Sequence, residues 1–369
     1  MPLRPVGGKL VMPLETAADV QRLFDVGVAL DKGALSDFAY MQYQRDLGDH
    51  LFYLGAIAPE RFAPLQETIV MLPEEQLQHF AYCGLETWLY FLRGAPDSCV
   101  EDLLQRLSET SKSASILQDM LAAIGTPTAL QALAGYARAS DKATELANMG
   151  FWIPPKTGPA VPRFTLERRA AQLQPFDGPL EDLLGLPHPV GLPLTAVMHD
   201  PDQQVVTWHY CSFTVGSIAG LPPVNATRLH LVSPPLFDVW TVHSALDTDG
   251  RYTQPTLSPD TEVDQPEMED LREMAITRQE VGRGQLILLP FDDELIYCNG
   301  HVELTPGVKG TVGGPPIGLY PNPFCPSCGK LMFHITTLRD GVRQYGDGFR
   351  SLFVCEECER VASHGTGWN

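Results

Sequence analysis

The sequence predicts an α+β multidomain protein, and three observations support this fold class. Apolar residues recur three and four positions apart as far as about residue 150, and short runs with a period of two follow from about residue 192. Two Cys-x-x-Cys pairs lie near the end of the chain. With 369 residues, of which 44% are hydrophobic, the chain is long enough to form at least two cores.

Residues 1–150 predict an all-α helical-repeat-like module. The helical spacing is clear in ETAADVQRLFDVGVAL and CVEDLLQRL, and Pro73 divides a further helical stretch in two. SILQDMLAAIGTPTALQALAGYARASD predicts two short antiparallel helices, the first ending at Gly125 and the second starting at Thr126 or Thr128. Helix pairs of this length resemble HEAT-type repeats, which stack because no single unit buries its apolar face.

A proline-rich join at residues 151–164 separates this module from a second domain at residues 165–369. RFTLERRAAQLQPF, which starts at Arg163, fits one more helix. Beyond LPLTAVMH, turn signals such as DPDQQ and DTDGRY separate alternating runs: QVVTWHYCSFTV, TRLHLV, DVWTVHSAL, GQLILLPF and ELIYCNGHVEL. The second domain is therefore predicted to be mostly antiparallel β.

The cysteine pairs are Cys325 and Cys328 in FCPSCGKLMF, and Cys355 and Cys358 in FVCEECERV. Each pair can offer two thiolates from one turn, and two such turns supply the four soft ligands that tetrahedral Zn²⁺ prefers. The spacing predicts a zinc-ribbon-type site of four cysteines over residues 325–358, with a long hairpin between the pairs. A site closed by four protein ligands has a structural role, because no coordination position stays open for substrate.

Alternatives exist for these cysteines. A disulfide or redox pair is one, but a thioredoxin-like motif needs a single Cys-x-x-Cys at a strand-to-helix junction. His334 or His364 is a candidate substitute for one cysteine ligand, which four thiolates make unnecessary. Gly329 suits a turn with positive φ directly after the first pair. The remaining cysteines are interpreted as reduced core residues: Cys83, Cys99, Cys211 and Cys298.

The chain is acidic, with a formal net charge of −19. Residues 1–150 carry 11 basic and 19 acidic groups, residues 151–300 carry 9 and 20, and residues 301–369 carry 6 and 6. This balance argues against nucleic-acid binding, which needs clustered cations, and favours a basic protein partner. Seven acids against one Arg in Asp260–Glu273 are interpreted as a solvated loop. Neither an export signal nor a membrane span is indicated, so a cytoplasmic protein is expected.

The segment that begins KGTVGGPPIGLYPNPFCPSCGKLMFHI carries a resemblance to a known family. Its elements are Lys309, Gly313-Gly314-Pro315, Cys325 to Met332, and Gly346-Asp347-Gly348 before Phe353. In this order they resemble the C-terminal part of the YwqG-like bacterial domains of unknown function and, more distantly, the eukaryotic programmed-cell-death-2 proteins. Leu319-Tyr320 stands where that family usually has Trp and Gln. The resemblance implies the family's fold and a binding role, with toxin immunity or chaperone-like contact as candidates.

Signatures of common enzymes are absent from the sequence, including Gly-x-Ser-x-Gly, the Walker lysine loop and His-Glu-x-x-His. GVKGTVGGPP, with Lys309, could cradle an anion, but turn geometry is the favoured interpretation. Two functions remain open. The favoured one is a zinc-stabilised protein-binding module, an immunity or chaperone-like protein for a basic partner. The alternative is a hydrolase or transferase with a site in a β-domain cleft lined by His209, His243 and Asp292–Glu294, where His301 could join the acids in holding a cation.

Overall fold

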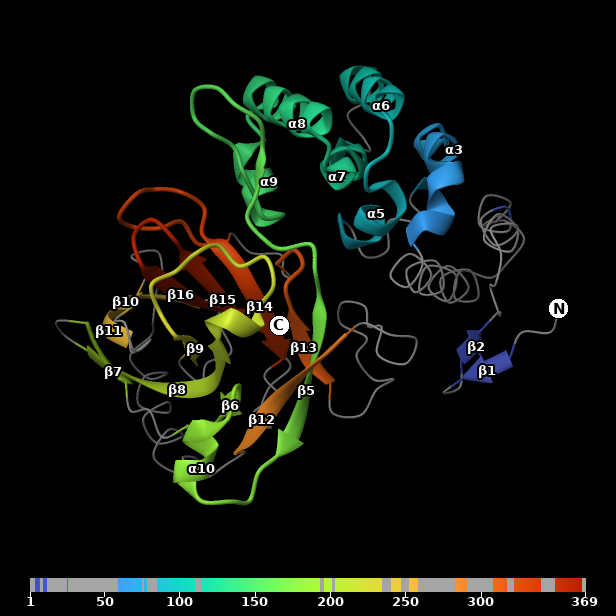
Figure 1. Ribbon diagram of the computed structural model, residues 1–369. Coiled ribbons are helices and arrows are strands. Elements are labelled where there is room, and N and C mark those ends of the chain that lie inside the picture. Colours follow the sequence, from blue (N-terminus) through green and yellow to red (C-terminus); the bar gives the residue numbers. More distant parts are fainter. Residues whose placement is uncertain are drawn as a thin grey trace. The chain divides into compact units, whose positions relative to one another are not determined.

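The computed structural model describes residues 4–6, 9–11, 25, 59–74, 76–77, 85–109, 114–192, 196–200, 203–233, 240–246, 252–257, 283–290, 308–316, 322–339 and 349–366 (Figure 1). Several predicted features lie outside these residues: most of the helical stretch at residues 15–30, Cys83, Cys298, the Asp260–Glu273 run, Asp292–Glu294, the alternating run at residues 294–304 and His301. The chain divides into two compact units. The first contains Met1–Ala143, Ile153–Val161 and Phe291–Leu304, and the second contains Thr144–Trp152, Pro162–Pro290 and Thr305–Asn369.

The first unit is helical over most of its described length. Its elements are the paired strands β1 (Arg4–Val6) and β2 (Lys9–Val11), then η2 (Pro59–Leu65), α3 (Gln66–Val70), α5 (Leu85–Leu92), α6 (Asp97–Glu109), α7 (Ala114–Ile124) and α8 (Pro127–Ser140). Aromatic side chains join η2 to α5, since the rings of Phe62 and Phe91 stack at 4.5 Å and Trp88 meets Phe91 edge-on. Helix α7 lies against α5, α6 and α8, so its side chains form the centre of this core.

The junction between α7 and α8 follows the sequence prediction. Gly125 takes a φ of +68° after α7, and the Thr126 side chain accepts a hydrogen bond from the Ala129 N–H at 3.3 Å to cap α8. The predicted break at Pro73 is also confirmed, because α3 ends at Val70. The helix pair is therefore confirmed, whereas a HEAT-type repeat stays a prediction. None of the described helices combines the length and apolar character that crossing a membrane requires.

The second unit is built on an antiparallel sheet. Its elements are α9 (Ala143–Asn148) and β4 (Val161–Pro162), which both begin in the first unit, and β3 (Phe151–Trp152), β5 (Arg169–Pro175), α10 (Leu180–Gly185), β6 (Pro189–Val190), β7 (Ala196–Asp200), β8 (Gln203–Thr214), η3 (Val215–Ser217), β9 (Arg228–Ser233), β10 (Trp240–Leu246), β11 (Tyr252–Leu257), β12 (Gly284–Pro290), β13 (Val308–Val312), β14 (Phe333–Arg339), β15 (Phe349–Cys355) and β16 (Arg360–Thr366). The strand order is β11-β10-β16-β15-β14-β13-β5-β12-β6-β8-β7, and β9 pairs with β8.

The sheet curls into a half-barrel. β7 and β11 stand at opposite ends of the strand order, yet they lie beside each other, and β9 lies against β15 and β16. Every pairing between the described strands of this sheet is antiparallel, which confirms the predicted class of the domain. The main apolar core of this unit is formed by side chains from the strands, and its fully buried members include Cys211, Phe213, Leu231, Ile335, Leu352 and Val361.

The prediction of a helix that starts at Arg163 is wrong, because Arg169–Pro175 forms strand β5. This strand runs between β12 and β13 and so joins early and late parts of the chain within the sheet. Ala171 is fully buried in the main core and Leu173 packs against it, two positions on, as in a strand. Residues of good helix propensity are therefore held in a strand by tertiary pairing on both sides.

Candidate metal centre

The structure brings the four predicted cysteines together. The Sγ atoms of Cys325, Cys328, Cys355 and Cys358 all lie within 4.8 Å of one another, and those of Cys328 and Cys355 are 3.6 Å apart. All four are free thiols. Zinc–sulfur bonds of about 2.3 Å in a tetrahedron place the sulfurs about 3.8 Å apart, so the donor set fits Zn²⁺ in number, type and spacing.

Each pair lies on a short turn, and the two turns are built alike. In the first knuckle, residues 325–330, the Cys325 N–H donates to the Lys330 carbonyl and the Gly329 N–H donates to the Cys325 carbonyl, both at 2.8 Å. In the second knuckle, residues 355–360, Cys355 pairs with Arg360 to close the hairpin of β15 and β16. In both cases the first cysteine pairs with the residue five positions later, so both thiols of a pair project from one loop.

The residue after each pair has left-handed backbone geometry. Gly329 has a φ of +69°, as expected from the sequence, and Glu359 occupies the corresponding position in the second knuckle with a φ of +49°. A residue with a Cβ suffers a steric penalty in this region, whereas glycine does not. The second knuckle therefore carries local strain that the first one lacks.

Replacing Glu359 with glycine is expected to raise the free energy of unfolding by about 1 kcal/mol, because it removes this steric penalty. Urea unfolding of the metal-loaded protein measures the change. The matched variant is Gly329→Ala, which introduces the same penalty into the first knuckle and should lower stability. Loss of stability in Glu359→Gly would show that the side chain contributes more than the backbone geometry costs.

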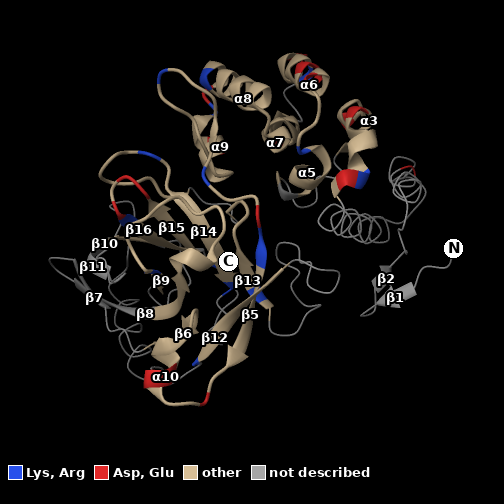
Figure 2. Ribbon diagram, in the orientation of Figure 1, with Lys and Arg blue, Asp and Glu red and all other residues tan. Residues whose placement is uncertain are grey.

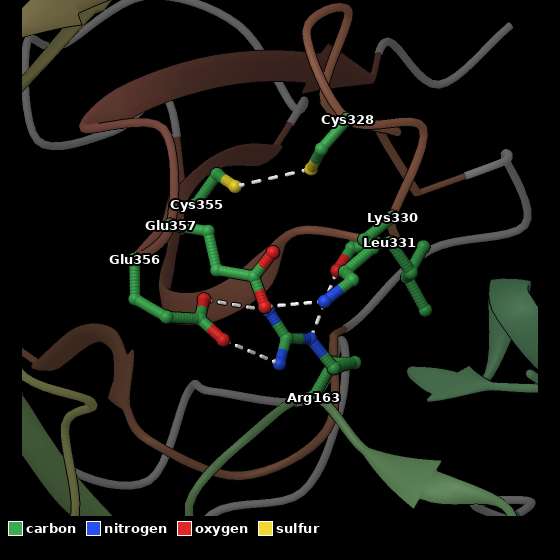
Figure 3. A network of polar contacts seen from close by, with 7 residues as sticks. All are labelled: Arg163, Cys328, Lys330, Leu331, Cys355, Glu356 and Glu357. Atoms are coloured by element: carbon green, nitrogen blue, oxygen red, sulfur yellow. Dashed lines mark hydrogen bonds and ion pairs between the residues drawn. The ribbon is translucent and has the colours of Figure 1, made fainter.

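Side chains join the two knuckles reciprocally. Lys330, the sixth residue of the first, forms an ion pair with Glu357, the third residue of the second (Figure 3). Arg360, the sixth residue of the second, donates from Nε to Oγ of Ser327, the third residue of the first, at 2.7 Å. In both contacts the sixth residue of one knuckle meets the third residue of the other, so the two knuckles are related by a local pseudo-two-fold pattern. Each contact holds one cysteine pair facing the other.

Arg163 links the second knuckle to Leu331, the residue directly after the first knuckle. Its Nε donates to the carbonyl of Leu331 at 2.8 Å, and its Nη1 and Nη2 donate to the two carboxylate oxygens of Glu356 at 2.9 and 2.7 Å (Figure 3). Burial raises the pKa of Glu356, but the hydrogen bonds from Arg163, a backbone hydrogen bond and the positive charges of Arg163 and Lys330 together hold that pKa below its ordinary value. The guanidinium therefore orients the loop that carries the second pair.

The ligands differ in their surroundings. Cys325 and Cys355 are buried in a small apolar cluster with Met332, Phe353 and Ala362, whereas Cys328 is exposed and Cys358 is half-buried. This cluster is separate from the main core of the half-barrel. Because it is small, the metal would supply much of the energy that keeps this end of the sheet folded.

The electrostatics also favour a cation. Burial raises the pKa of the Cys325 thiol, but hydrogen bonds from the N–H groups of Cys328 and Ser327 bring it below its ordinary value. The pKa of Cys358 rises to about 11, first through burial and then through contacts with Cys328 and Cys325. Burial likewise raises the pKa of Cys355. Without a cation the first thiolate thus opposes formation of the others, and a divalent metal removes this opposition.

The two candidate histidines do not join the cysteine cluster. His334 donates from Nδ1 to the Gly314 carbonyl at 2.9 Å, and its Nε2 lies 2.9 Å from Oγ1 of Thr337. Nδ1 of His364 lies 2.8 Å from Oγ1 of Thr241. Among the residues that the structure describes, the group that could hold a metal ion consists of the four cysteines, the same set that the sequence predicts.

His334 is expected to stay neutral down to about pH 4, because burial lowers its pKa to about 4, with the positive charge of Arg168 acting in the same direction. In the unfolded chain the ring takes up a proton as pH falls through its ordinary pKa of about 6.5. The free energy of unfolding should therefore fall by roughly 3 kcal/mol as the pH is lowered from about 6.5 to about 4. NMR titration of the ring protons tests this. A titration midpoint near pH 6.5 in the folded protein would contradict it.

His209 lies in a closed network on β8. The Leu192 N–H donates to its Nδ1 at 3.1 Å, so in the neutral ring Nε2 carries the proton and donates to Oγ of Ser212 at 2.7 Å. The Ser212 hydroxyl then donates to Nδ1 of His230 at 2.7 Å. Ser212 has no exposed surface, which favours a packed polar network over an open catalytic group.

The other predicted groups have structural positions or lie outside the described residues. His243 is buried on β10, where burial lowers its pKa. The cleft with Asp292–Glu294 stays a prediction, because those acids are not described. Gly313 and Gly314 form a turn at φ of +78° and +80°, with their N–H groups donating to the carbonyls of Ile335 and Thr165. These donors are used within the protein, so the turn interpretation is confirmed.

Sequence reasoning missed the residues that join the knuckles. Lys330 and Arg360 are the sixth residues of CPSCGK and CEECER, and the third residue of each motif is polar. Alignment of the two motifs could therefore have indicated the contacts between them. The sequence around Arg163 gave no such signal, because its partners Leu331 and Glu356 follow it by 168 and 193 positions.

Comparison with protein-family models, with curated proteins and with solved structures found no match for this chain. The resemblance to YwqG-like domains and to programmed-cell-death-2 proteins therefore stays a prediction.

Proposed function

We propose that this chain is a zinc-stabilised protein-binding module of the YwqG-like type, with one structural Zn²⁺ at the four-cysteine centre. The observation that carries the metal assignment is the convergence of four free thiols on two knuckles that Lys330, Arg360 and Arg163 join. Four thiolates complete a tetrahedron and leave no position for substrate, so the metal's role is to hold the fold.

The partner in this proposal is a basic protein, and the role is that of an immunity or chaperone-like protein. The net charge of −19 supports it. Glu67 on α3 and Glu101 and Glu109 on α6 are exposed. Figure 2 marks acidic positions in red on both helices. The proposal places the protein in the cytoplasm, where a reducing environment preserves thiol ligands. Complementary charge would mainly raise the rate of encounter.

Affinity capture from the native host with the zinc-loaded protein tests the binding role, followed by kinetics with the captured partner. The association rate is expected to fall steeply with added salt, because ions screen charges beyond about 8 Å at physiological strength. Changing Glu67, Glu101 and Glu109 to glutamine should lower that rate.

The matched control neutralises acids on α10, with Glu181→Gln and Asp182→Asn, and should leave the association rate near that of the wild type. A partner that is acidic, or an association rate that is independent of salt and of the three substitutions, would contradict electrostatic recognition by the helical unit. If no protein partner is captured and the purified protein turns over a small-molecule substrate, the hydrolase or transferase alternative is favoured.

A further inference from the structure

The four thiols differ in access even though the two knuckles are built alike. Cys328 is exposed, whereas its positional counterpart Cys358 is half-buried, and Cys325 and Cys355 are each only 1% exposed. The neighbours of Cys328 in its turn leave it open, since Pro326, Ser327 and Gly329 are all exposed.

The two knuckles also differ at the residue after each cysteine pair. A Cβ at this position would meet no heavy atom within 4 Å, so the space beside the first knuckle is open. In the second knuckle Glu359 has a side chain at the corresponding position. Oxidation of thiolates follows access as well as charge state, and all four thiols are thiolates when a metal is bound. Access therefore decides which sulfur reacts first.

A second thiol stands ready to react with an oxidised Cys328. Its Sγ lies 3.6 Å from Sγ of Cys355, in the other knuckle (Figure 3). A disulfide needs about 2.0 Å between sulfurs, so this pair must close by roughly 1.6 Å. β14 and β15, which lie between the knuckles in sequence, pair antiparallel and keep the two turns at the same end of the sheet.

We propose that Cys328 is the site at which hydroperoxides oxidise the metal-loaded protein, that Cys355 resolves the product as a disulfide, and that the metal leaves as a result. The inference rests on the proposed zinc site and adds a modification to it. It gives the exposed thiolate a role that a purely structural ligand does not need.

The chemistry balances with a hydroperoxide as the oxidant. The Cys328 thiolate attacks the peroxide, the O–O bond breaks, and hydrogen peroxide yields a sulfenic acid and, after taking up one proton, water. The Cys355 thiolate then attacks the Cys328 sulfur, the S–S bond forms, the S–O bond breaks, and the leaving hydroxide takes up a proton. Two thiolates have lost two electrons and the peroxide has become two waters. Only two of the four thiolates then remain to bind zinc, so the metal dissociates.

The test uses the full chain loaded with zinc, whose content is measured first. Hydrogen peroxide is then added in small steps, released zinc is followed with a chromogenic chelator, and dimedone is present in a parallel sample to trap sulfenic acid. We expect dimedone on Cys328, a disulfide that links the Cys328 and Cys355 peptides, and one zinc released per disulfide formed, with recovery of the free thiols after dithiothreitol.

Two variants sharpen the test. Cys328→His keeps a nitrogen ligand for zinc, as in natural sites with three cysteines and one histidine, but removes the reactive thiolate, so zinc release by peroxide should slow at least tenfold. Cys358→His is the matched change in the other knuckle and should remain as sensitive as the wild type. Should either variant fail to hold zinc, the peptide mapping of the wild type decides alone.

The outcomes separate the two claims. A protein without bound zinc would overturn the proposed metal centre. A zinc-loaded protein that retains its metal under peroxide, that is labelled first at another cysteine, or that forms disulfides within each knuckle would overturn the inference about Cys328 and leave the metal centre standing.

Discussion

Replacing Cys325 with serine is expected to release the metal and unfold the end of the half-barrel that carries the two knuckles. Cys325 is buried in the small cluster with Met332 and Phe353, and it accepts hydrogen bonds from the N–H groups of its own turn. Structural zinc contributes an apparent free energy of about 10–16 kcal/mol in zinc-finger peptides, which is comparable with the total stability of a domain. Loss of one thiolate should therefore cost more than about 5 kcal/mol.

Metal analysis and circular dichroism measure this effect. Zinc should fall from about one per chain to none, while the helical signal of the first unit survives, because α5 to α8 have a core of their own. Cys99→Ala is the control, since Cys99 is buried in α6 and belongs to the helical unit. Full zinc retention in Cys325→Ser, or loss of most helical signal, would contradict the structural role or the separate cores.

The four-cysteine cluster could be predicted from sequence because its information is local. Each pair of cysteines and the turn that holds it lie within six consecutive residues, and Gly329 has the positive φ that such a turn needs. The strands β8, β9, β10 and β12 were predicted for a similar reason, since alternation along a short run defines both faces of a strand.

The parts that sequence missed depend on contacts between distant segments. β5 contains residues of good helix propensity, and it is a strand because β12 and β13 supply pairing partners on both sides. The network at the metal centre is of the same kind, because Arg163 meets Glu356 across 193 positions. A single arginine before the β domain carries no pattern that would reveal its partner.

Arg163→Met is expected to lower the free energy of unfolding by about 3–5 kcal/mol, because it removes one partner of a largely buried ion pair. The side chains of Arg163 and Glu356 are 10% and 21% exposed, so both are mostly removed from water. The substitution leaves the Glu356 carboxylate without its two guanidinium hydrogen bonds and the Leu331 carbonyl without its donor. An unpaired buried acceptor costs more than the hydrogen bond itself contributes.

Lys330→Met is the matched control, because it also removes one positive charge that joins the knuckles. The ion pair of Lys330 with Glu357 is far more exposed, at 33% and 48%, and surface pairs contribute about 0–1 kcal/mol. Urea unfolding of the zinc-loaded proteins compares the two. Equal losses for Arg163→Met and Lys330→Met would show that burial does not distinguish these contacts.

A double variant separates the contribution of the ion pair with Glu356 from that of the hydrogen bond to Leu331. Arg163→Met with Glu356→Leu removes both charges, and replacing a buried pair with apolar side chains is often close to neutral, so stability should recover by about 1–3 kcal/mol over the single variant. The carbonyl of Leu331 remains without its donor, so recovery should be incomplete. Full recovery would assign the whole loss to the unpaired carboxylate. No recovery would show that Arg163 acts through the Leu331 carbonyl, directly after the first knuckle, rather than through Glu356.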